Sequence, residues 1–354
     1  MTATARIKVS PEDFVVDEID AYPATGDGPH TLIRIRKRGL TTDAALARIA
    51  EALGVDRRAC GHAGLKDKEA VTTQRLSLPE VAPERALSLR WDDLEVLEAA
   101  RHRNKLKPGH LRGNRFDLVL REVSDVPTVI AALERIGREG FPNAFGPQRF
   151  GRDGDNAERA LAFVRGENRG PRDPRERRFI FSALQSRWFN RLLERRVTDG
   201  SYRVPLAGDL LKKHESGGMF LCEDLETDRA RAERGEVSPT GPMFGIDMAR
   251  PGPEVLAFEL KVLAEDGLTL DRLAAHRALG EGTRRVLRIL PADLAAVAHG
   301  DPAAIRVTMT LPKGAYATTA LSAAVSLLPG HSANQPQPGA ESGIDTVDHT
   351  ETPQ

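Results

Sequence analysis

Residues 61–72, GHAGLKDKEAVT, set one carboxylate, Asp67, between two lysines directly after a glycine-punctuated apolar run. The pattern is typical of an active-site loop. The residues before the loop predict a strand followed by a helix, because an alternating pattern at residues 30–37 gives way to a helical pattern of apolar residues at 43–53. Thr42 is a good N-cap for that helix and Gly54 suits its C-terminal end.

Periodic apolar patterns predict the remaining elements. Strands are predicted at residues 7–9, 14–19, 30–37, 73–78, 115–121, 284–290 and 305–311, and helices at 43–53, 126–139, 179–192 and 315–328. The order of these elements predicts an α+β core that is interrupted and then resumed. We place the core at residues 1–153 and 281–330 and an inserted domain, rich in arginine, at residues 154–280.

The charge of the chain is balanced overall but not locally. Fifty-one basic and fifty-one acidic residues cancel, which at first argues against a nucleic-acid-binding protein. However, residues 101–121 hold seven basic side chains against Asp117 alone, and residues 165–196 hold ten arginines against four acids. A single such cluster is more often a solvated face with ordinary ion pairs. Two clusters together favour contact with a polyanion.

Several sequence features bear on location and on metal binding. Cys60 and Cys222 lie far apart in the sequence and lack the spacing of a zinc site. We expect both to be small buried apolar residues of a protein in a reducing cytoplasm. The chain shows neither a signal-peptide pattern nor the roughly 18 consecutive apolar residues of a membrane helix, so we expect a soluble cytoplasmic protein. Residues 331–354 have no Phe, Tyr or Trp and no Lys or Arg, and this composition predicts a disordered acidic tail.

The motifs that are missing restrict the chemistry. Phosphate-binding, dinucleotide-binding, metalloprotease and serine-hydrolase signatures do not occur in the sequence. One carboxylate without a cofactor indicates nucleophilic or general-base catalysis at a sugar carbon. Such an acid must be ionised, which calls for a nearby cation. In an extended chain Lys66 and Lys68 would point away from Asp67, towards phosphates, so the cation is expected from elsewhere.

A reaction on a nucleotide would also need groups that hold the base. Phe145, beside Gly146, is a plausible stacking ring, and Asn143 offers both a donor and an acceptor. Each has an ordinary structural alternative. Phe145 could be a core residue beside a turn, Asn143 could form a turn after Pro142, and Asp67 could be a turn carboxylate paired with lysines.

Several of these motifs together resemble the tRNA pseudouridine synthase D (TruD) family. They are PEDF at 11–14, the 61–72 loop, NRFDLVLR at 114–121, GFPNAFGPQRFG at 140–151 and LPKGAYAT at 311–318. They occur in the family's order and span nearly the whole chain before the tail. The resemblance implies a pseudouridine synthase-like α+β core with a mostly antiparallel bisected sheet and an inserted α/β domain.

The resemblance also implies roles for individual residues. It places the catalytic aspartate on Asp67, its basic partner on Lys8 and an asparagine next to the aspartate on Asn143. The aromatic positions of the active site fall on Phe14 and Phe145. The implied substrate is a uridine in the D-arm of tRNA, at position 13 of the tRNA convention, which is isomerised to pseudouridine without a cofactor or metal.

We assign further substrate contacts to Lys66, Lys68, Arg115 and Arg149, and we expect a monomer without a protein partner. Ala144 departs from the family pattern, since many members carry an aromatic residue there. Two other functions stay open. The chain could be an RNA-binding or tRNA-folding module whose catalysis is dispensable, or an RNA glycosidase or nuclease that uses Asp67 as its general acid or base.

Overall fold

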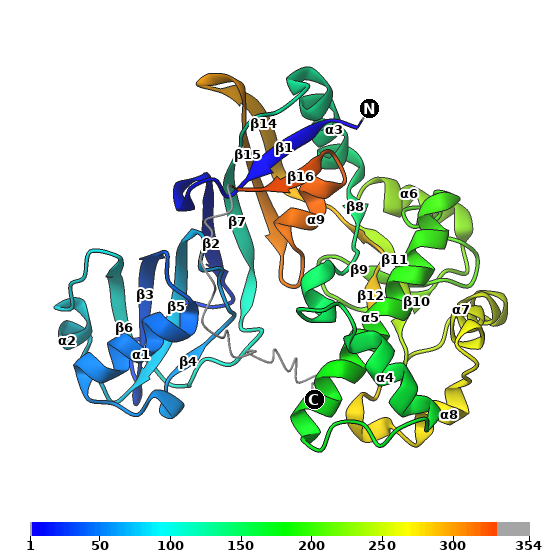
Figure 1. Ribbon diagram of the computed structural model, residues 1–354, viewed down its shortest axis with the longest axis horizontal. Coiled ribbons are helices and arrows are strands. Elements are labelled where there is room, and N and C mark those ends of the chain that lie inside the picture. Colours follow the sequence, from blue (N-terminus) through cyan, green and yellow to red (C-terminus); the bar gives the residue numbers. More distant parts are fainter. Residues whose placement is uncertain (1, 331–354) are drawn as a thin grey trace. The chain divides into compact units, whose positions relative to one another are not determined.

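The computed structural model describes residues 2–330, and these form two compact units (Figure 1). The first unit contains residues 2–138 and 291–330, and the second is Glu139–Leu290. The predicted tail, residues 331–354, lies outside the described residues. Among the residues described, no helix combines the length and the apolar composition that crossing a bilayer requires.

The first unit is built on an eight-stranded sheet. Its order is β14-β15-β7-β2-β5-β3-β6, and β4 pairs with β5 beside this path. The strands are β2 (Phe14–Asp20), β3 (His30–Arg38), β4 (Gly61–His62), β5 (Val71–Pro79), β6 (Leu94–His102), β7 (Leu111–Leu120), β14 (Ala292–His299) and β15 (Asp301–Pro312). Neighbouring strands are antiparallel except β2 and β5, which are parallel. The predicted α+β class with a mostly antiparallel sheet is therefore confirmed.

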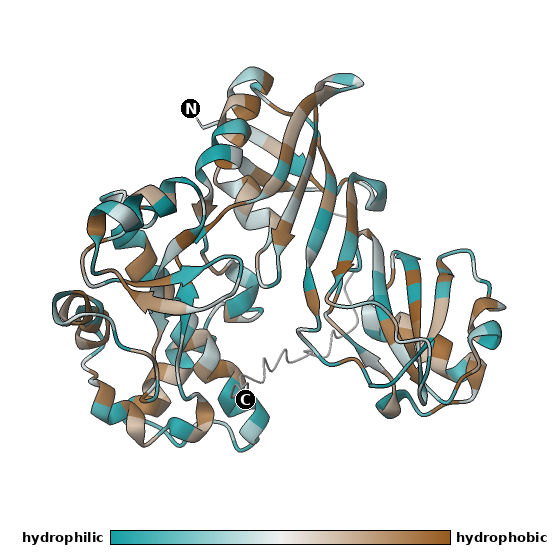
Figure 2. Cartoon of the chain, turned by 180° about the vertical axis from the view of Figure 1, so that it is seen from behind, coloured by the Kyte–Doolittle hydropathy of each residue, from teal (hydrophilic) through white to brown (hydrophobic). Residues whose placement is uncertain are grey.

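Alternation of side chains sets the faces of this sheet (Figure 2). In β7, Phe116, Leu118 and Leu120 are buried on one face, whereas on the other face Arg115 is exposed and Asp117 partly exposed. A helix, α1 (Thr42–Leu53), packs its apolar residues against β3, β5 and β6.

The ends of α1 are defined by two caps. Its N-cap is Thr41 rather than the predicted Thr42, because the Thr41 side chain accepts the Ala44 N–H. Gly54 ends the helix in the left-handed region, at a φ of 69°, as predicted.

Short elements complete the first unit. They are η1 (Pro11–Asp13), η2 (Arg57–Ala59), α2 (Pro83–Leu87), α3 (Val126–Glu139) and α9 (Ala317–Ser322), and a parallel pair of β1 (Thr4–Ile7) and β16 (Ser326–Pro329). The limits of α3 agree with the prediction. The single helix predicted at 315–328 is wrong, because the chain leaves α9 and forms strand β16, whose hydrogen bonds are satisfied by β1. The predicted strand at 7–9 is likewise displaced, to β1.

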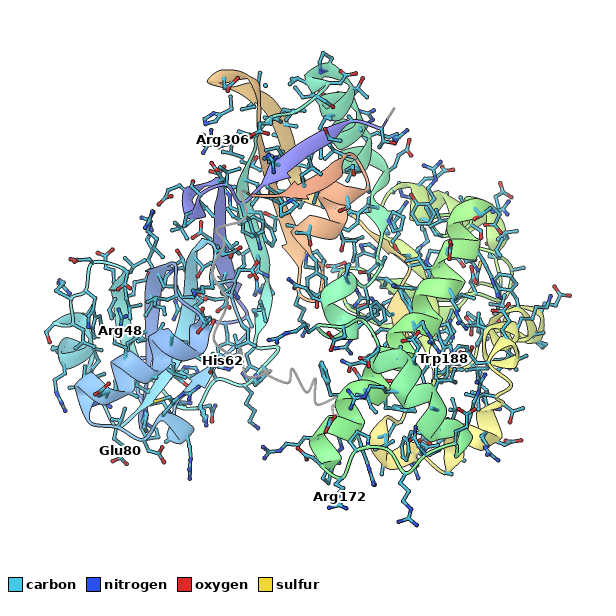
Figure 3. All side chains as sticks on the ribbon, in the orientation of Figure 1. Arg48, His62, Glu80, Arg172, Trp188 and Arg306 are labelled. Atoms are coloured by element: carbon cyan, nitrogen blue, oxygen red, sulfur yellow. The ribbon has the colours of Figure 1, made fainter. Side chains whose placement is uncertain are left out.

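The second unit surrounds one long helix, α5 (Pro174–Thr198). A four-stranded sheet of order β10-β9-β11-β12 and a two-stranded β8–β13 pair accompany it. The other elements are η3 (Pro147–Phe150), α4 (Asn156–Arg165), α6 (Leu225–Glu233), α7 (Pro253–Glu265), α8 (Leu270–Ala274), η4 (Arg277–Leu279), β8 (Phe141–Pro142), β9 (Leu210–Lys213), β10 (Met219–Leu221), β11 (Val237–Met243), β12 (Thr283–Val286) and β13 (Arg288–Ile289). Trp188 lies in the core of this unit (Figure 3).

The boundaries predicted for the inserted domain need correction. They were placed after residue 153 and before residue 281, whereas the second unit already begins at Glu139 and extends to Leu290. The reason is a pairing between distant segments: β8 is hydrogen-bonded to β13, so both ends of the unit are joined in one small sheet. The predicted strand 284–290 accordingly divides into β12 and β13, both inside this unit.

Buried ion pairs stabilise the second unit. Arg284 donates to both carboxylate oxygens of Glu259, and neither side chain is exposed to solvent by more than 1%. Arg196 makes a similar pair with Asp209. A buried charge that loses its partner is strongly destabilising.

We therefore expect Glu259→Ala to lower the free energy of unfolding by about 3–5 kcal/mol, because it leaves Arg284 buried and uncompensated. Urea denaturation followed by tryptophan fluorescence measures the change. Glu265→Ala on the same helix is the control, since Glu265 is half exposed and pairs with Arg195 at the surface. The control should change stability by less than about 1 kcal/mol, and equal losses in the two variants would contradict the expectation.

Candidate active site

The carboxylate of Asp67 is exposed and paired. Asp67 lies in the loop between β4 and β5, and its side chain is 49% exposed. Lys8 Nζ donates to Asp67 Oδ2 at 2.9 Å. The structure thus brings together the two residues that the family resemblance placed in the catalytic centre.

Sheet pairing explains why residues so far apart in sequence meet. β2 and β5 are parallel, with Val15 opposite Val71, so both strands begin at the same edge of the sheet. The turn that precedes β2 carries Lys8, and the loop that precedes β5 carries Asp67. Parallel pairing of the two strand starts therefore places the lysine beside the carboxylate.

Lys8 has an unusual backbone and a supporting ring. Its φ is 58°, in the left-handed region, which a residue with a side chain adopts only under constraint. Its Nζ lies 4.4 Å from the centre of the Phe14 ring, a cation–π contact. The Phe14 ring packs edge-on against Phe116 and is only 3% exposed. Phe14 therefore supports Lys8, which corrects the predicted direct contact with substrate.

A buried carboxylate fixes the turn after Lys8. Asp13 accepts two hydrogen bonds from the Arg121 guanidinium and one from the Ser10 N–H. Burial alone would raise the pKa of Asp13, but the Arg121 and Ser10 hydrogen bonds hold it below its usual range. The carboxylate thus stays ionised and holds the turn in place at neutral pH.

Lys66 does not point towards solvent as predicted. Its Nζ donates to Glu18 Oε2 at 2.5 Å, and the lysine side chain is only 6% exposed. The second Glu18 oxygen accepts the Arg75 N–H. The prediction assumed an extended chain, whereas the loop turns Lys66 inwards, so Lys66 anchors the loop and is not a phosphate contact.

Two further side chains hold the backbone of the loop. Thr42 Oγ1 accepts the Lys66 N–H at 2.8 Å and donates to Gln74 Oε1 at 2.9 Å. Gln74 Nε2 donates in turn to the Gly64 carbonyl. These polar residues are buried, so their hydrogen bonds are made without competition from water.

Sequence reasoning missed most of these anchors, although a signal was present. Glu18 continues the buried alternation of Phe14 and Val16, and Lys37 continues that of Ile33 and Ile35. A charged residue at an inward position of a strand requires a polar partner. That requirement marks both residues as candidates for a functional site.

Two more polar side chains lie on this face of the sheet. Asn114 on β7 is the register partner of Glu18, and Thr72 on β5 is the partner of Lys37. Asn114 Oδ1 and Thr72 Oγ1 are buried and have no hydrogen-bond partner among the described residues. The hydrogen-bonding capacity of these two oxygens is therefore unused within residues 2–330.

Lys68 and Arg115 are exposed basic residues of the first unit. Among the described residues, neither side chain makes a hydrogen bond or an ion pair at contact distance, although Arg115 lies near Asp117. Both are therefore free to contact an anion from solvent.

The other predicted residues belong to the second unit, where they form a cluster around Phe145. The Arg285 guanidinium lies 4.1 Å and the Arg149 guanidinium 5.4 Å from the centre of the ring. Asn190 holds the Phe145 backbone through both its N–H and its carbonyl. Arg149 also donates to Ser186 and to Ser182. Arg149 therefore braces a ring that is partly buried.

Asn143 is engaged within the same unit. Its Nδ2 donates to the Val286 carbonyl at 2.9 Å, and its Oδ1 accepts from Arg285. The residue is 4% exposed. Asn143 thus links the segment that carries Phe145 to strand β12.

The chain is similar to known proteins over almost all of its described residues. The profile of a family described as tRNA pseudouridine synthase D (TruD) matches residues 2–169 and 173–323. A tRNA pseudouridine synthase D of Anaeromyxobacter sp. (strain Fw109-5) is 46% identical over 321 residues, which cover 89% of this chain and 90% of that protein. A Thermus thermophilus protein of the same name is 39% identical over 318 residues, with 89% and 87% covered.

A solved structure shares the fold. It is the Methanosarcina mazei protein assigned as tRNA pseudouridine synthase D (TruD), with a TM-score of 0.73 and 22% identity. The alignment covers 92% of this chain and 94% of that one.

The anchoring of the Asp67 loop can be tested through one hydroxyl. Thr42→Val removes the acceptor of the Lys66 N–H and leaves buried polar groups unsatisfied, so we expect that amide to exchange its hydrogen faster by roughly one to two decades. Hydrogen exchange followed by mass spectrometry measures the effect. Thr128→Val is the control, because its hydroxyl donates only to Asp125 at the start of α3. Unchanged exchange at residues 64–68 would show that Thr42 does not hold the loop.

Proposed function

Because the chain belongs to the tRNA pseudouridine synthase D family, and is therefore an isomerase that converts uridine in tRNA to pseudouridine, we propose that Asp67 is its catalytic carboxylate. One observation carries the proposal. Asp67 is half exposed and ion-paired with Lys8, while the loop beneath it is anchored by buried side chains. The carboxylate is accessible to a ligand and yet fixed in position.

The reaction needs little more than such a group. The N1–C1′ bond of uridine breaks, a C5–C1′ bond forms, and the proton lost from C5 is balanced by one gained at N1. A carboxylate can assist by adding to C1′ or by removing the proton from C2′. Both routes need an ionised oxygen held at the sugar, and Lys8 supplies the counter-charge that orients it.

The uridine must leave the RNA stack to reach Asp67, so its base needs a new stacking partner. Phe145 is the proposed partner, and its ring already has Arg285 and Phe189 packed against it. The second unit would be the inserted domain of the family, and the substrate would be the D-arm uridine at position 13. We further propose that the enzyme acts as a monomer in the cytoplasm.

The phosphates of tRNA would be bound by basic residues that lack an acidic partner. In the first unit Lys68 and Arg115 make no ion pair at contact distance with the described residues, although Arg115 lies near Asp117. In residues 165–196 half of the ten arginines are ion-paired with acids, namely Arg165, Arg187, Arg191, Arg195 and Arg196. The predicted patch is therefore smaller than the sequence count suggested.

Four arginines of that stretch remain available. Arg169, Arg172, Arg175 and Arg178 are exposed, and none of their side chains makes a hydrogen bond or an ion pair with the described residues. They lie within ten residues of one another, two just before α5 and two in its first turns, and Arg172 lies at the periphery of its unit in Figure 3. We name them the α5 arginine patch. Unpaired guanidinium groups on one segment suit the backbone of RNA.

Asp67→Asn should abolish pseudouridine formation in tRNA and leave tRNA binding unchanged, because the amide keeps the size of the side chain and loses its charge. Single-turnover release of tritium from C5-labelled uridine measures the reaction. Asp43→Asn is the control, since Asp43 is a half-exposed carboxylate of the same unit that pairs with Arg57. Turnover by the Asp67→Asn protein would refute the assignment.

Replacing all four residues of the α5 arginine patch by glutamine should weaken tRNA binding and flatten its salt dependence. For up to four lost phosphate contacts, the slope of log K against log salt should become less steep by about 3. A matched control replaces four ion-paired arginines of the same unit, Arg159, Arg195, Arg234 and Arg277. Equal slopes for the wild type and the patch variant would exclude this surface.

A further inference from the structure

Lys37 is an unusual side chain for a sheet interior. It lies on β3, is 1% exposed, and is among the largest fully buried side chains of the chain. Its Nζ donates to the Leu40 carbonyl at 2.5 Å and to the Asp67 carbonyl at 2.9 Å. Lysine is almost never fully buried without a specific partner. Here both partners are backbone oxygens, and one belongs to the residue proposed as catalytic.

The surroundings of Lys37 contain little compensating charge. Among the described residues, no carboxylate lies within ion-pair distance of its Nζ. Of the charged groups in the loop above it, Asp67 attracts the ammonium and Lys66 repels it. On the neighbouring strands its register partners are Thr72 and Leu94, which are uncharged. Burial lowers the pKa of Lys37 from 10.5 to about 8, against the opposing effect of Asp67.

The contact to Asp67 differs from the other anchors of the loop. Thr42 and Gln74 hold the backbone at Lys66 and Gly64, on the N-terminal side of the catalytic residue. Within the described residues, Lys37 alone binds the backbone of Asp67 itself. An apolar residue would fill this position in β3 at lower energetic cost, so packing alone does not account for a lysine here.

We propose that Lys37, in its protonated form, is a positioning residue that fixes the backbone of Asp67 from inside the sheet, so that the carboxylate is presented to Lys8 and the substrate. This inference rests on the catalytic role proposed for Asp67. Lys37 touches neither substrate nor the reacting atoms. It acts through the Asp67 carbonyl, one of the two that it binds, and its charge lies beneath the carboxylate.

The two effects of Lys37 on the protein have opposite pH dependence. Because its folded pKa is about 8 and its unfolded value about 10.5, the unfolded chain binds more protons between these values, and the contribution of Lys37 to stability rises with pH in this window. Over the same window the amine loses its charge, and the neutral amine, although it keeps two N–H donors, binds the Leu40 and Asp67 carbonyls more weakly. Activity should therefore fall above pH 8 while stability does not. If Lys37 had a purely structural role, activity and stability would not respond differently to pH.

The first measurement uses the wild-type enzyme on full-length tRNA. The single-turnover rate, followed by tritium release between pH 6.5 and 10, is expected to decline with a midpoint near the pKa of about 8. Unfolding by urea at the same pH values reports stability. A rate that stays constant through pH 9.5 overturns the proposal, and so does a rate that declines only where the protein unfolds.

The second measurement uses Lys37→Met, which keeps the length of the side chain but removes its charge and its donors. We expect the single-turnover rate to fall on the order of 100-fold, as for a displaced catalytic group, with tRNA affinity unchanged and the decline near pH 8 absent. Lys37→Arg, which keeps a charge and donors, should recover part of the rate. Thr31→Val is the matched control, because Thr31 makes a buried hydrogen bond to the Val81 carbonyl from the same strand.

The outcomes separate the two proposals. A folded Lys37→Met protein with the wild-type rate, beside an inactive Asp67→Asn protein, refutes the role of Lys37 alone. An active Asp67→Asn protein refutes the catalytic role of Asp67 and removes the basis for positioning it. If Lys37→Met does not fold, the wild-type pH profile still decides, because it needs no substitution.

Discussion

The exposed carboxylate of Asp67 keeps a fixed orientation because its loop is bound from below by polar groups that are themselves buried. Glu18, Thr42 and Lys37 each bind a different part of the loop. Each of them replaces an apolar residue that would pack in the same place, and a buried polar group without its partner is costly. The interior tolerates these residues because their polar groups bond to the loop and to neighbouring groups, namely the Arg75 N–H, the Gln74 side chain and the Leu40 carbonyl.

The order of the strands makes this anchoring possible. β2, β5 and β3 are consecutive in the sheet, so inward-facing side chains from three distant segments share one face beneath the loop. The one parallel contact of the eight-stranded sheet, between β2 and β5, lies within this trio and aligns the two turns that carry Lys8 and Asp67. The left-handed backbone of Lys8 is a constraint that the surrounding contacts must maintain, as is common where geometry serves a site. Fold and site thus depend on the same pairing.

Local patterns in the sequence predicted what local physics determines. The limits of α3 follow from its apolar spacing, and Gly54 marks the end of α1. Pairings between distant segments were not predictable in this way. β16 was taken for helix because its partner β1 lies at the other end of the chain, and the limits of the second unit were misplaced because β8 and β13 are far apart in sequence.

The same division applies to the site. The Asp67 loop and Lys8 were found through motifs, whereas Lys66 was misjudged because its direction depends on a buried acid contributed by β2. Phe14 was taken for a substrate contact because motif matching identifies an aromatic residue of the active site but does not show whether its ring is buried. Glu18 and Lys37 were detectable as charged residues at inward positions of alternating strands. What they bind could not be read from that alternation.

A chain without net charge can still bind a polyanion if many of its acidic side chains are buried in ion pairs. In the second unit, Asp209, Glu259 and Asp266 are buried, and each neutralises at least one arginine that composition alone would count as free positive charge. The α5 arginine patch has no such partners among the described residues, so its field extends into solvent. Total charge therefore says little about RNA binding here. The informative quantity is the number of basic groups left without an acid, and this depends on the fold rather than on composition.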